Sequence, residues 1–343
     1  MNTRQGIGEG ETRSPVLVEV WRGDMLESLH RGAAVVASPR GDVVVAWGEP
    51  ERIVLPRSAI KMVQALPLIE SGAAEKAGLD DRHLALACAS HSGRDEHTAL
   101  TAAWLARLGL GERDLRCGAH MPFDEEAAAR LIRRGAPPSQ LHNNCSGKHC
   151  GFLTVARHLG AGLDYVAPAH PVQQAVRRAI EETAGETIAG FVIDGCSAPN
   201  FALSLRGLAT AMARFARPNG FFARTRADAA ARLVTAMAEY PELVAGPGRP
   251  ATRLIRAAKG RAVAKSGAEG VFTAILPETG LGIAVKIDDG AARAAAAVVT
   301  ALLVRFGALE RDDPAVAALA DAPVRNWRGL ECGRLRAASS LLD

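Results

Sequence analysis

Lysine is scarce in this sequence. The chain has 343 residues and 41 lysines and arginines, and only six of these are lysine. Arginine carries a positive charge equally well but stays protonated in proteins, whereas a lysine amine can lose its proton and act as a base. The positions of the few lysines are therefore the first places to look for chemistry.

Several other features are missing. The chain has few aromatic residues (9 Phe, 4 Trp and 2 Tyr), and no run of basic residues accompanies its net charge of +4, so we expect no nucleic-acid partner. No uninterrupted apolar run reaches the length of a membrane span, and residues 1–14 contain no apolar signal segment. The six cysteines are irregularly spaced. We therefore expect a flexible tail over 1–14, reduced thiols, no membrane partner and a cytoplasmic location.

Expected strands lie towards both ends of the chain. The β-branched runs VLVEVWRG, AAVVAS and DVVVAWG predict three strands in hairpins, and GVFTAIL and LGIAVKI predict another hairpin around the turn PETG. Alanine- and leucine-rich segments between them predict helices, beginning with one over 58–76, and a long helix is expected over 291–306. We predict an α+β fold with a mixed sheet built from both termini and an inserted helical lobe. The expected single catalytic unit covers 15–336, with a sheet lobe over about 15–57 and 260–336 and a helical lobe over about 58–259.

The stretch LPRSAIKMVQALP places Ser58 three residues before Lys61, so the two side chains share a face if the segment is helical. Lys61 could take the proton of Ser58 if burial or a second cation lowers its pKa by roughly three units. The spacing alone is weak evidence, because a capping serine followed by a solvated lysine is its ordinary meaning.

Two further sequence elements follow this S-x-x-K motif along the chain, and their order is informative. Ser90 lies in the loop motif SHSG, and Lys265 begins a K-S-G triplet that leads into a strand. An S-x-x-K motif, a loop serine and a K-[ST]-G triplet form the layout of serine β-lactamases and penicillin-binding proteins, although the S-D-N motif is missing here. We therefore predict that fold, with Lys265 either lowering the pKa of Lys61 or activating Ser90.

Two loops are rich in metal-binding side chains. The loop HNNCSGKHCGF carries Cys145, His149 and Cys150, and IDGCSAPNF carries Cys196. These four residues could bind zinc through thiolates and an imidazole, but their spacing fits no common zinc motif. They could equally be small buried thiols on glycine-rich loops.

The segments RSAIKMVQALPLIESGAA, ALACASHSGRDEH, NNCSGKHCGFL, HPVQQAV, DGCSAPNFALSL and AKSGAEGVF closely resemble the Asparaginase II family, over about residues 15–336. The resemblance implies a fold similar to that of β-lactamases and glutaminases, L-asparaginase activity and a homodimer. It also implies two serine–lysine pairs, Ser58 with Lys61 and Ser90 with Lys265. The implied zinc ion, one per chain, would be bound by Cys145, Lys148 and Cys196, with His149 as the more conventional alternative ligand.

The resemblance also places Arg57 and Asp194 at the substrate, and we expect His91 and the backbone N–H of Ala268 to lie there too. A cysteine that some members carry near the substrate is Ala251 here. We expect zinc to orient the site and not to activate water, because two thiolates make the ion a weak Lewis acid. The alternatives are another serine acyl transfer, such as β-lactam or amino-acid amide hydrolysis, zinc hydrolase chemistry, and a non-catalytic zinc- or metabolite-binding relative.

Overall fold

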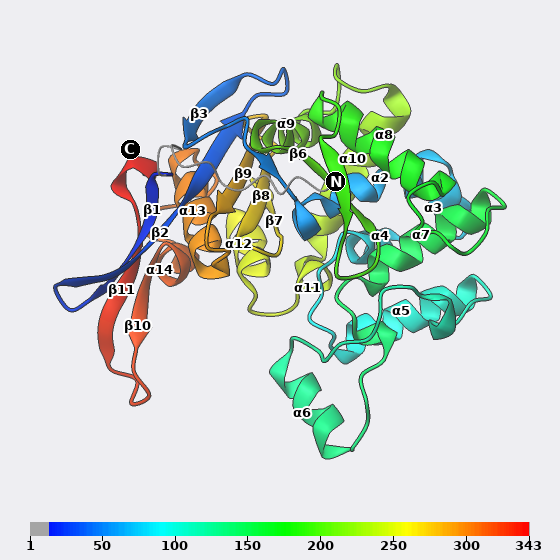
Figure 1. Ribbon diagram of the computed structural model, residues 1–343, viewed down its shortest axis with the longest axis horizontal. Helices are drawn as coiled ribbons and strands as arrows, with labels where there is room; N and C mark the ends of the chain where they lie inside the picture. The colour runs from blue at the N-terminus through cyan, green and yellow to red at the C-terminus, as the bar shows by residue number, and fades with distance from the viewer. Residues whose placement is uncertain (1–13, 343) are drawn as a thin grey trace, which may run out of the picture.

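The computed structural model describes residues 14–342, so nearly all of the tail expected over 1–14 lies outside the described residues. Its main feature is a sheet with the strand order β10-β11-β1-β2-β9-β8-β7, in which β3 also pairs with β2 (Figure 1). Every described pair in this sheet is antiparallel, where the sequence led us to expect a mixed sheet. The strands are β1 (Val16–Arg22), β2 (Met25–Ala37), β3 (Val43–Trp47), β7 (Val263–Ser266), β8 (Val271–Leu276), β9 (Leu281–Ile287), β10 (Asp321–Arg325) and β11 (Glu331–Ala337).

Both ends of the chain build this sheet, as the sequence predicted. Strand β2 from the first part of the chain pairs with β9 from the last part, in register from Gly32 opposite Ile287 to Ala37 opposite Gly282. The helices between them form a second lobe beside the sheet (Figure 1). The α+β fold with an inserted helical lobe is thereby confirmed.

The helical lobe also contains a small sheet, in the order β4-β6-β5. Its elements begin with η1 (Arg57–Ile60), α1 (Lys61–Gln64), α2 (Leu66–Glu70), α3 (Ala73–Lys76), α4 (Asp81–Ala87), α5 (Asp95–Arg107), η2 (Glu112–Asp114), α6 (Glu125–Arg133), η3 (Gln140–His142), α7 (Ser146–His158) and α8 (Pro171–Ala184). They continue with β5 (Gly190–Ile193), β6 (Pro199–Ser204), α9 (Leu205–Ala216), α10 (Arg224–Glu239), α11 (Pro241–Val244) and α12 (Pro250–Ala258), and β4 (Ile53–Val54) precedes η1. Between β9 and β10 come α13 (Ala292–Arg305) and α14 (Pro314–Leu319), and η4 (Ser339–Leu341) follows β11.

The prediction of a single helix over 58–76 is wrong in detail, because the segment forms a 3-10 turn followed by three short helices. Pro67 has no N–H to continue the helix from α1 into α2. Gly72 has a φ of +78°, a left-handed conformation that ends α2. The helix expected over 291–306 is confirmed as α13. No described helix is long and apolar enough to cross a membrane.

The central strands are buried on both faces. All six residues of β8 are buried, and both α9 and α13 pack on β8 and β9. The contact with α9 is so close that a Cβ on Gly282 of β9 would lie 2.1 Å from Ala209 O and 2.2 Å from Ala213 N. Glycine at this position therefore lets the first helix after the small sheet lie directly on the large one.

We expect Gly282→Ala to lower the free energy of unfolding by about 3 kcal/mol, the upper end for overpacking a tight core, because backbone atoms of α9 cannot move aside as a side chain can. Urea denaturation measures this change. Gly162→Ala is the matched control, since a Cβ there has no neighbour within 4 Å. Equal free energies of unfolding for the two variants would show that α9 can move away from Gly282 without destabilising the protein.

Candidate active site

Three segments that are distant in sequence meet at the hydroxyl of Ser90. Lys61 Nζ, from α1, lies 3.1 Å from Ser90 Oγ, and Lys265 Nζ, from β7, lies 3.0 Å from the same oxygen. Both lysines are only 1% exposed. The structure thus brings together three of the four residues that were predicted to be catalytic, with the serine between the two amines.

Lys61 Nζ has three partners: Ser90 Oγ, the carbonyl of Ala89 and, at 3.1 Å, Cys145 Sγ. Its three possible N–H donors therefore have three acceptors. The fourth predicted residue, Ser58, is half-buried in η1, and within residues 14–342 its hydroxyl makes no hydrogen bond to Lys61. The direct pairing of Ser58 with Lys61 therefore stays a prediction, whereas Lys61 and Ser90 are in contact.

Lys265 is the lysine whose pKa is lowered. Burial, reinforced by the positive charge of Lys61, holds the pKa of the Lys265 amine well below its ordinary value of 10.5. Besides Ser90 Oγ, the amine donates to Ser266 O at 2.9 Å. A neutral amine keeps a lone pair, so the electrostatics favour Lys265 as the base that sequence reasoning assigned to Lys61.

The turn of Ser58 is held against the K-S-G strand. Thr273 Oγ1, on β8, donates to Ala59 O at 2.9 Å, and a Cβ on Gly267 would lie 2.8 Å from Pro56 O. The backbone N–H groups of Ser58 and Ala268 border this junction, and no hydrogen bond from either is found in the described chain. Two free N–H groups at one junction are what an oxyanion hole requires.

Cys145 and Cys196, the two cysteines that the family resemblance assigns to zinc, also lie close together. Lys148 Nζ lies 3.0 Å from Cys196 Sγ, the Cys145 thiol donates to the same sulfur, and all three side chains are buried. The hydrogen bond from Cys145, together with the charge of Lys148, lowers the pKa of Cys196 to about 4 and leaves that of Cys145 raised to about 12. Burial opposes the charge on Lys148, but the two sulfurs outweigh it and raise the pKa of its amine.

Two sulfur donors and one amine at the same point suit the preference of zinc for sulfur and nitrogen ligands. In residues 14–342, no three His, Cys, Asp or Glu side chains are arranged to hold a metal ion, so a site here needs the lysine. The ring of His149 faces Tyr165, whose hydroxyl is 2.8 Å from Nδ1, and its buried Nε2 has no partner. The donor set therefore favours Lys148 over His149.

Arg57 and Asp194 form an ion pair next to these groups. The Nη2 and Nε atoms of Arg57 lie 2.8 and 2.9 Å from Asp194 Oδ1. Burial alone would raise the pKa of Asp194, but the hydrogen bond from Arg57 and the charges of Lys148 and Arg57 lower it overall. Asp194 is thus a carboxylate that faces the cysteine loop, where a cationic group of a substrate would be stabilised.

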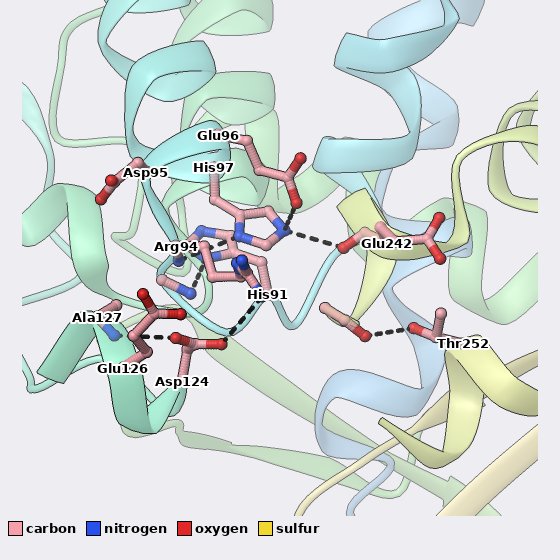
Figure 2. Close-up of polar contacts among 12 residues, drawn as sticks. His91, Arg94, Asp95, Glu96, His97, Asp124, Glu126, Ala127, Glu242 and Thr252 are labelled. Atoms are coloured by element: carbon pink, nitrogen blue, oxygen red, sulfur yellow. Dashed lines mark hydrogen bonds and ion pairs between the residues drawn. The ribbon is translucent and has the colours of Figure 1, made fainter. Parts of the chain in front are cut away.

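His91 lies behind the site. Its ring is fully buried and stacks on His97 with centroids 4.8 Å apart (Figure 2). Gly93 N donates to His91 Nδ1, so Nε2 carries the proton that it shares with Ser146 Oγ at 2.8 Å. His97 likewise accepts from Arg94 N and donates to Glu242 O at 2.9 Å. His91 is therefore placed to position the Ser90 loop, and its contact with substrate stays a prediction.

Sequence reasoning missed the contact of Lys61 with Cys145 and the role of Thr273. Neither has a local signal, because Lys61 and Cys145 are 84 positions apart in sequence and the bond from Thr273 to Ala59 O crosses between the two lobes. His97 had a weak signal, since it stands three residues after Arg94 at the start of α5, where its ring accepts the Arg94 N–H as in a capping box.

A serine hydroxyl between two buried lysine amines, on this α+β fold, is the arrangement of a serine-type amidohydrolase. The family model for L-asparaginase II matches residues 18–337, and the chain belongs to this family. The family resemblance read from the sequence is thereby confirmed. No curated protein sequence matches the chain.

Several solved structures are similar to this chain at low sequence identity. A β-lactamase from Mycobacterium bovis is 16% identical, with a TM-score of 0.44 over 80% of this chain and 94% of its own. Mglu, in a form with tris and glutamate, is 15% identical, with a TM-score of 0.47 over 86% of this chain and 63% of its own. The simvastatin synthase LovD from Aspergillus terreus is 12% identical, with a TM-score of 0.41 over 75% of this chain and 86% of its own.

The two stacked histidines predict a dependence of stability on pH. Burial lowers the pKa of His91 and of His97 in the folded state, so below about pH 6.5 the unfolded chain binds more protons than the folded one. Stability should therefore fall as the pH is lowered from 6.5 to 5, by up to about 1.4 kcal/mol per pH unit for each histidine. His97→Gln should remove one of these two contributions. Urea denaturation at several pH values checks the slope, and a constant offset between the two proteins would contradict this account.

Proposed function

We propose that the protein hydrolyses the side-chain amide of L-asparagine to L-aspartate and ammonia through a serine acyl-enzyme. The observation that carries the proposal is the Ser90 hydroxyl held between Lys61 and Lys265, in a chain of the L-asparaginase II family. A neutral amine hydrogen-bonded to a serine provides a base and a proton path without a histidine.

In the first half of the reaction, Ser58 Oγ attacks the amide carbon and forms the ester bond. Its proton enters the hydrogen-bonded group of Lys61, Ser90 and Lys265, where the neutral Lys265 accepts it. The free N–H groups of Ser58 and Ala268 stabilise the oxyanion. As the carbon–nitrogen bond breaks, Ser90 returns a proton to the nitrogen and ammonia leaves.

In the second half, water attacks the ester carbon while Lys265, through Ser90, takes a proton from it. The carbon–oxygen bond to Ser58 breaks, the serine regains its proton and L-aspartate leaves. Asp194, kept ionised by Arg57, pairs with the α-ammonium of the substrate. The nucleophile is identified by the serine whose alanine variant no longer forms the covalent adduct seen by mass spectrometry. An adduct that persists in Ser58→Ala and is lost in Ser90→Ala would exchange the two roles.

We also propose one zinc ion per chain, held by Cys145, Lys148 and Cys196. When bound, zinc supplies positive charge that keeps the sulfurs as thiolates. The chain itself links this cluster to the proton-transferring Ser90, because Lys61 Nζ hydrogen-bonds to both Cys145 Sγ and Ser90 Oγ. The expected homodimer stays a prediction.

Turnover should depend on a neutral Lys265. Because protonation of this amine removes the base, we expect kcat to fall as the pH decreases through its lowered pKa. Lys265→Arg keeps the charge but cannot accept a proton, so kcat for ammonia release should fall at least roughly 100-fold. Lys76→Arg, which changes an exposed lysine of α3, is the control and should leave kcat unchanged. A Lys265→Arg variant with more than a tenth of normal turnover would show that Lys265 is not the base.

Zinc content tests the metal proposal independently of turnover. Elemental analysis of the purified protein should find one zinc per chain, and Lys148→Met and Cys196→Ser should lose most of it, because each removes a ligand. His149→Gln and Cys332→Ser should keep it, since His149 faces Tyr165 and Cys332 lies on β11. Zinc should also raise the melting temperature of the wild type. Loss of zinc in His149→Gln with retention in Lys148→Met would reverse the ligand assignment.

A further inference from the structure

Two loops lie directly against the turn that carries Ser90. Ser90 N donates to Val244 O at 2.8 Å, and Gly246 lies so close that a Cβ on it would be 2.4 Å from Ser92 Oγ. The positive φ of Gly246, +112°, allows this approach. The loop after α11 therefore runs along the turn that carries Ser90 before it reaches Arg249, which precedes α12.

The second loop comes from the segment before α6. Asp124 N donates to Ser92 O at 3.0 Å, and a Cβ on Gly93 would lie 3.1 Å from Pro122. Figure 2 shows Asp124 beside Arg94, whose Nη1 lies 3.5 Å from Asp124 Oδ2. Phe123, next to Asp124, is 51% exposed, so its ring lies at the surface beside the Ser90 turn.

Arg249 and Phe123 connect the two loops. The Arg249 guanidinium lies over the Phe123 ring, 6.0 Å from its centroid, and Phe123 stacks on His120 with centroids 4.8 Å apart. His120 Nε2 in turn accepts from Asn144 N at 3.0 Å, beside Cys145. An aromatic ring thus holds the guanidinium by its face, which leaves its N–H edge available to a ligand.

Arg249 differs from the neighbouring arginines, because each of those forms an ion pair with a carboxylate. Arg57 pairs with Asp194, Arg94 with Asp124 and Arg256 with Glu242. Arg249 is exposed, and within residues 14–342 it makes no ion pair. Its charge has only a small influence on the pKa of Lys265, after burial, Lys61 and two thiols, and this places Arg249 within electrostatic reach of that amine.

We propose that Arg249 is a specificity residue that binds the α-carboxylate of the amino-acid substrate, with Phe123 holding its guanidinium in place. This inference rests on the proposed function, because it assigns the substrate group that Asp194 does not bind. A planar guanidinium binds a carboxylate through two parallel hydrogen bonds, whereas Arg57 already uses two N–H groups on Asp194. The site therefore takes substrates that carry a free carboxylate next to the amine.

Kinetics with two matched substrates test this role. β-Alaninamide has the amine and the reacting amide of L-asparagine but no α-carboxylate. For Arg249→Met we expect kcat/KM with L-asparagine to fall roughly tenfold or more, mainly through KM, while kcat/KM with β-alaninamide stays within about twofold. For Arg249→Lys we expect kcat/KM with L-asparagine to lie between those of the wild type and Arg249→Met, because lysine keeps the positive charge but lacks the two parallel N–H groups of the guanidinium. Arg224→Met, which changes a surface arginine of α10 whose side chain is 95% exposed, should change neither substrate. An equal loss with both substrates, or no loss with L-asparagine, would overturn the proposal.

Binding measurements separate this inference from the proposed function. Calorimetry compares L-aspartate with β-alanine, which lacks only the α-carboxylate. The wild type should bind L-aspartate at least roughly tenfold more tightly than Arg249→Met does, and β-alanine should bind the two proteins equally. If the wild type releases no ammonia from L-asparagine but binding still follows Arg249, the proposed function fails and the carboxylate site stands. If the wild type and Arg249→Met bind L-aspartate equally, or neither binds it, Arg249 has no such role.

Discussion

Two buried lysine amines share the half-buried hydroxyl of Ser90, so the charge of one acts at short range on the other. Lys61 and Lys265 each lie about 3 Å from Ser90 Oγ and are almost completely buried. Burial disfavours the ammonium form of Lys265, and the positive charge of Lys61 disfavours it further. The crowding therefore creates the neutral amine from which the proposed chemistry follows, and it falls on Lys265, which has no sulfur partner.

This crowding depends on the contact between the lobes. Lys61 and Ser90 belong to the helical lobe and Lys265 to the sheet, so their distances are set by how η1 lies against β7 and β8. Thr273 and Gly267 fix that contact, one by a hydrogen bond to Ala59 O and the other by having no side chain. The sulfur of Cys145 fixes the other side of Lys61.

The sequence predicted those parts that have a local pattern. The β-branched runs gave the strands of the first hairpins, and the S-x-x-K motif, the loop serine and the K-S-G triplet gave the four candidate catalytic residues. It could not predict that Lys61 hydrogen-bonds to Ser90, because the two residues are 29 positions apart and no local pattern joins them. The same holds for Ser90 and Lys265, which are 175 positions apart. Pro67 and Gly72 could have indicated that the segment 58–76 is divided into short helices. The apolar positions continue at helical spacing across both residues, and so they predicted one helix.

The pairing of β2 with β9 has a consequence for synthesis on the ribosome. The strand made within the first 37 residues has no partner on this side until residues 281–287 have left the exit tunnel. Contacts of such long sequence separation form slowly, and the edge of β2 stays open to wrong partners in the meantime. The large sheet of this protein is therefore completed only after residues 281–287 have been made, however early β2 itself emerges.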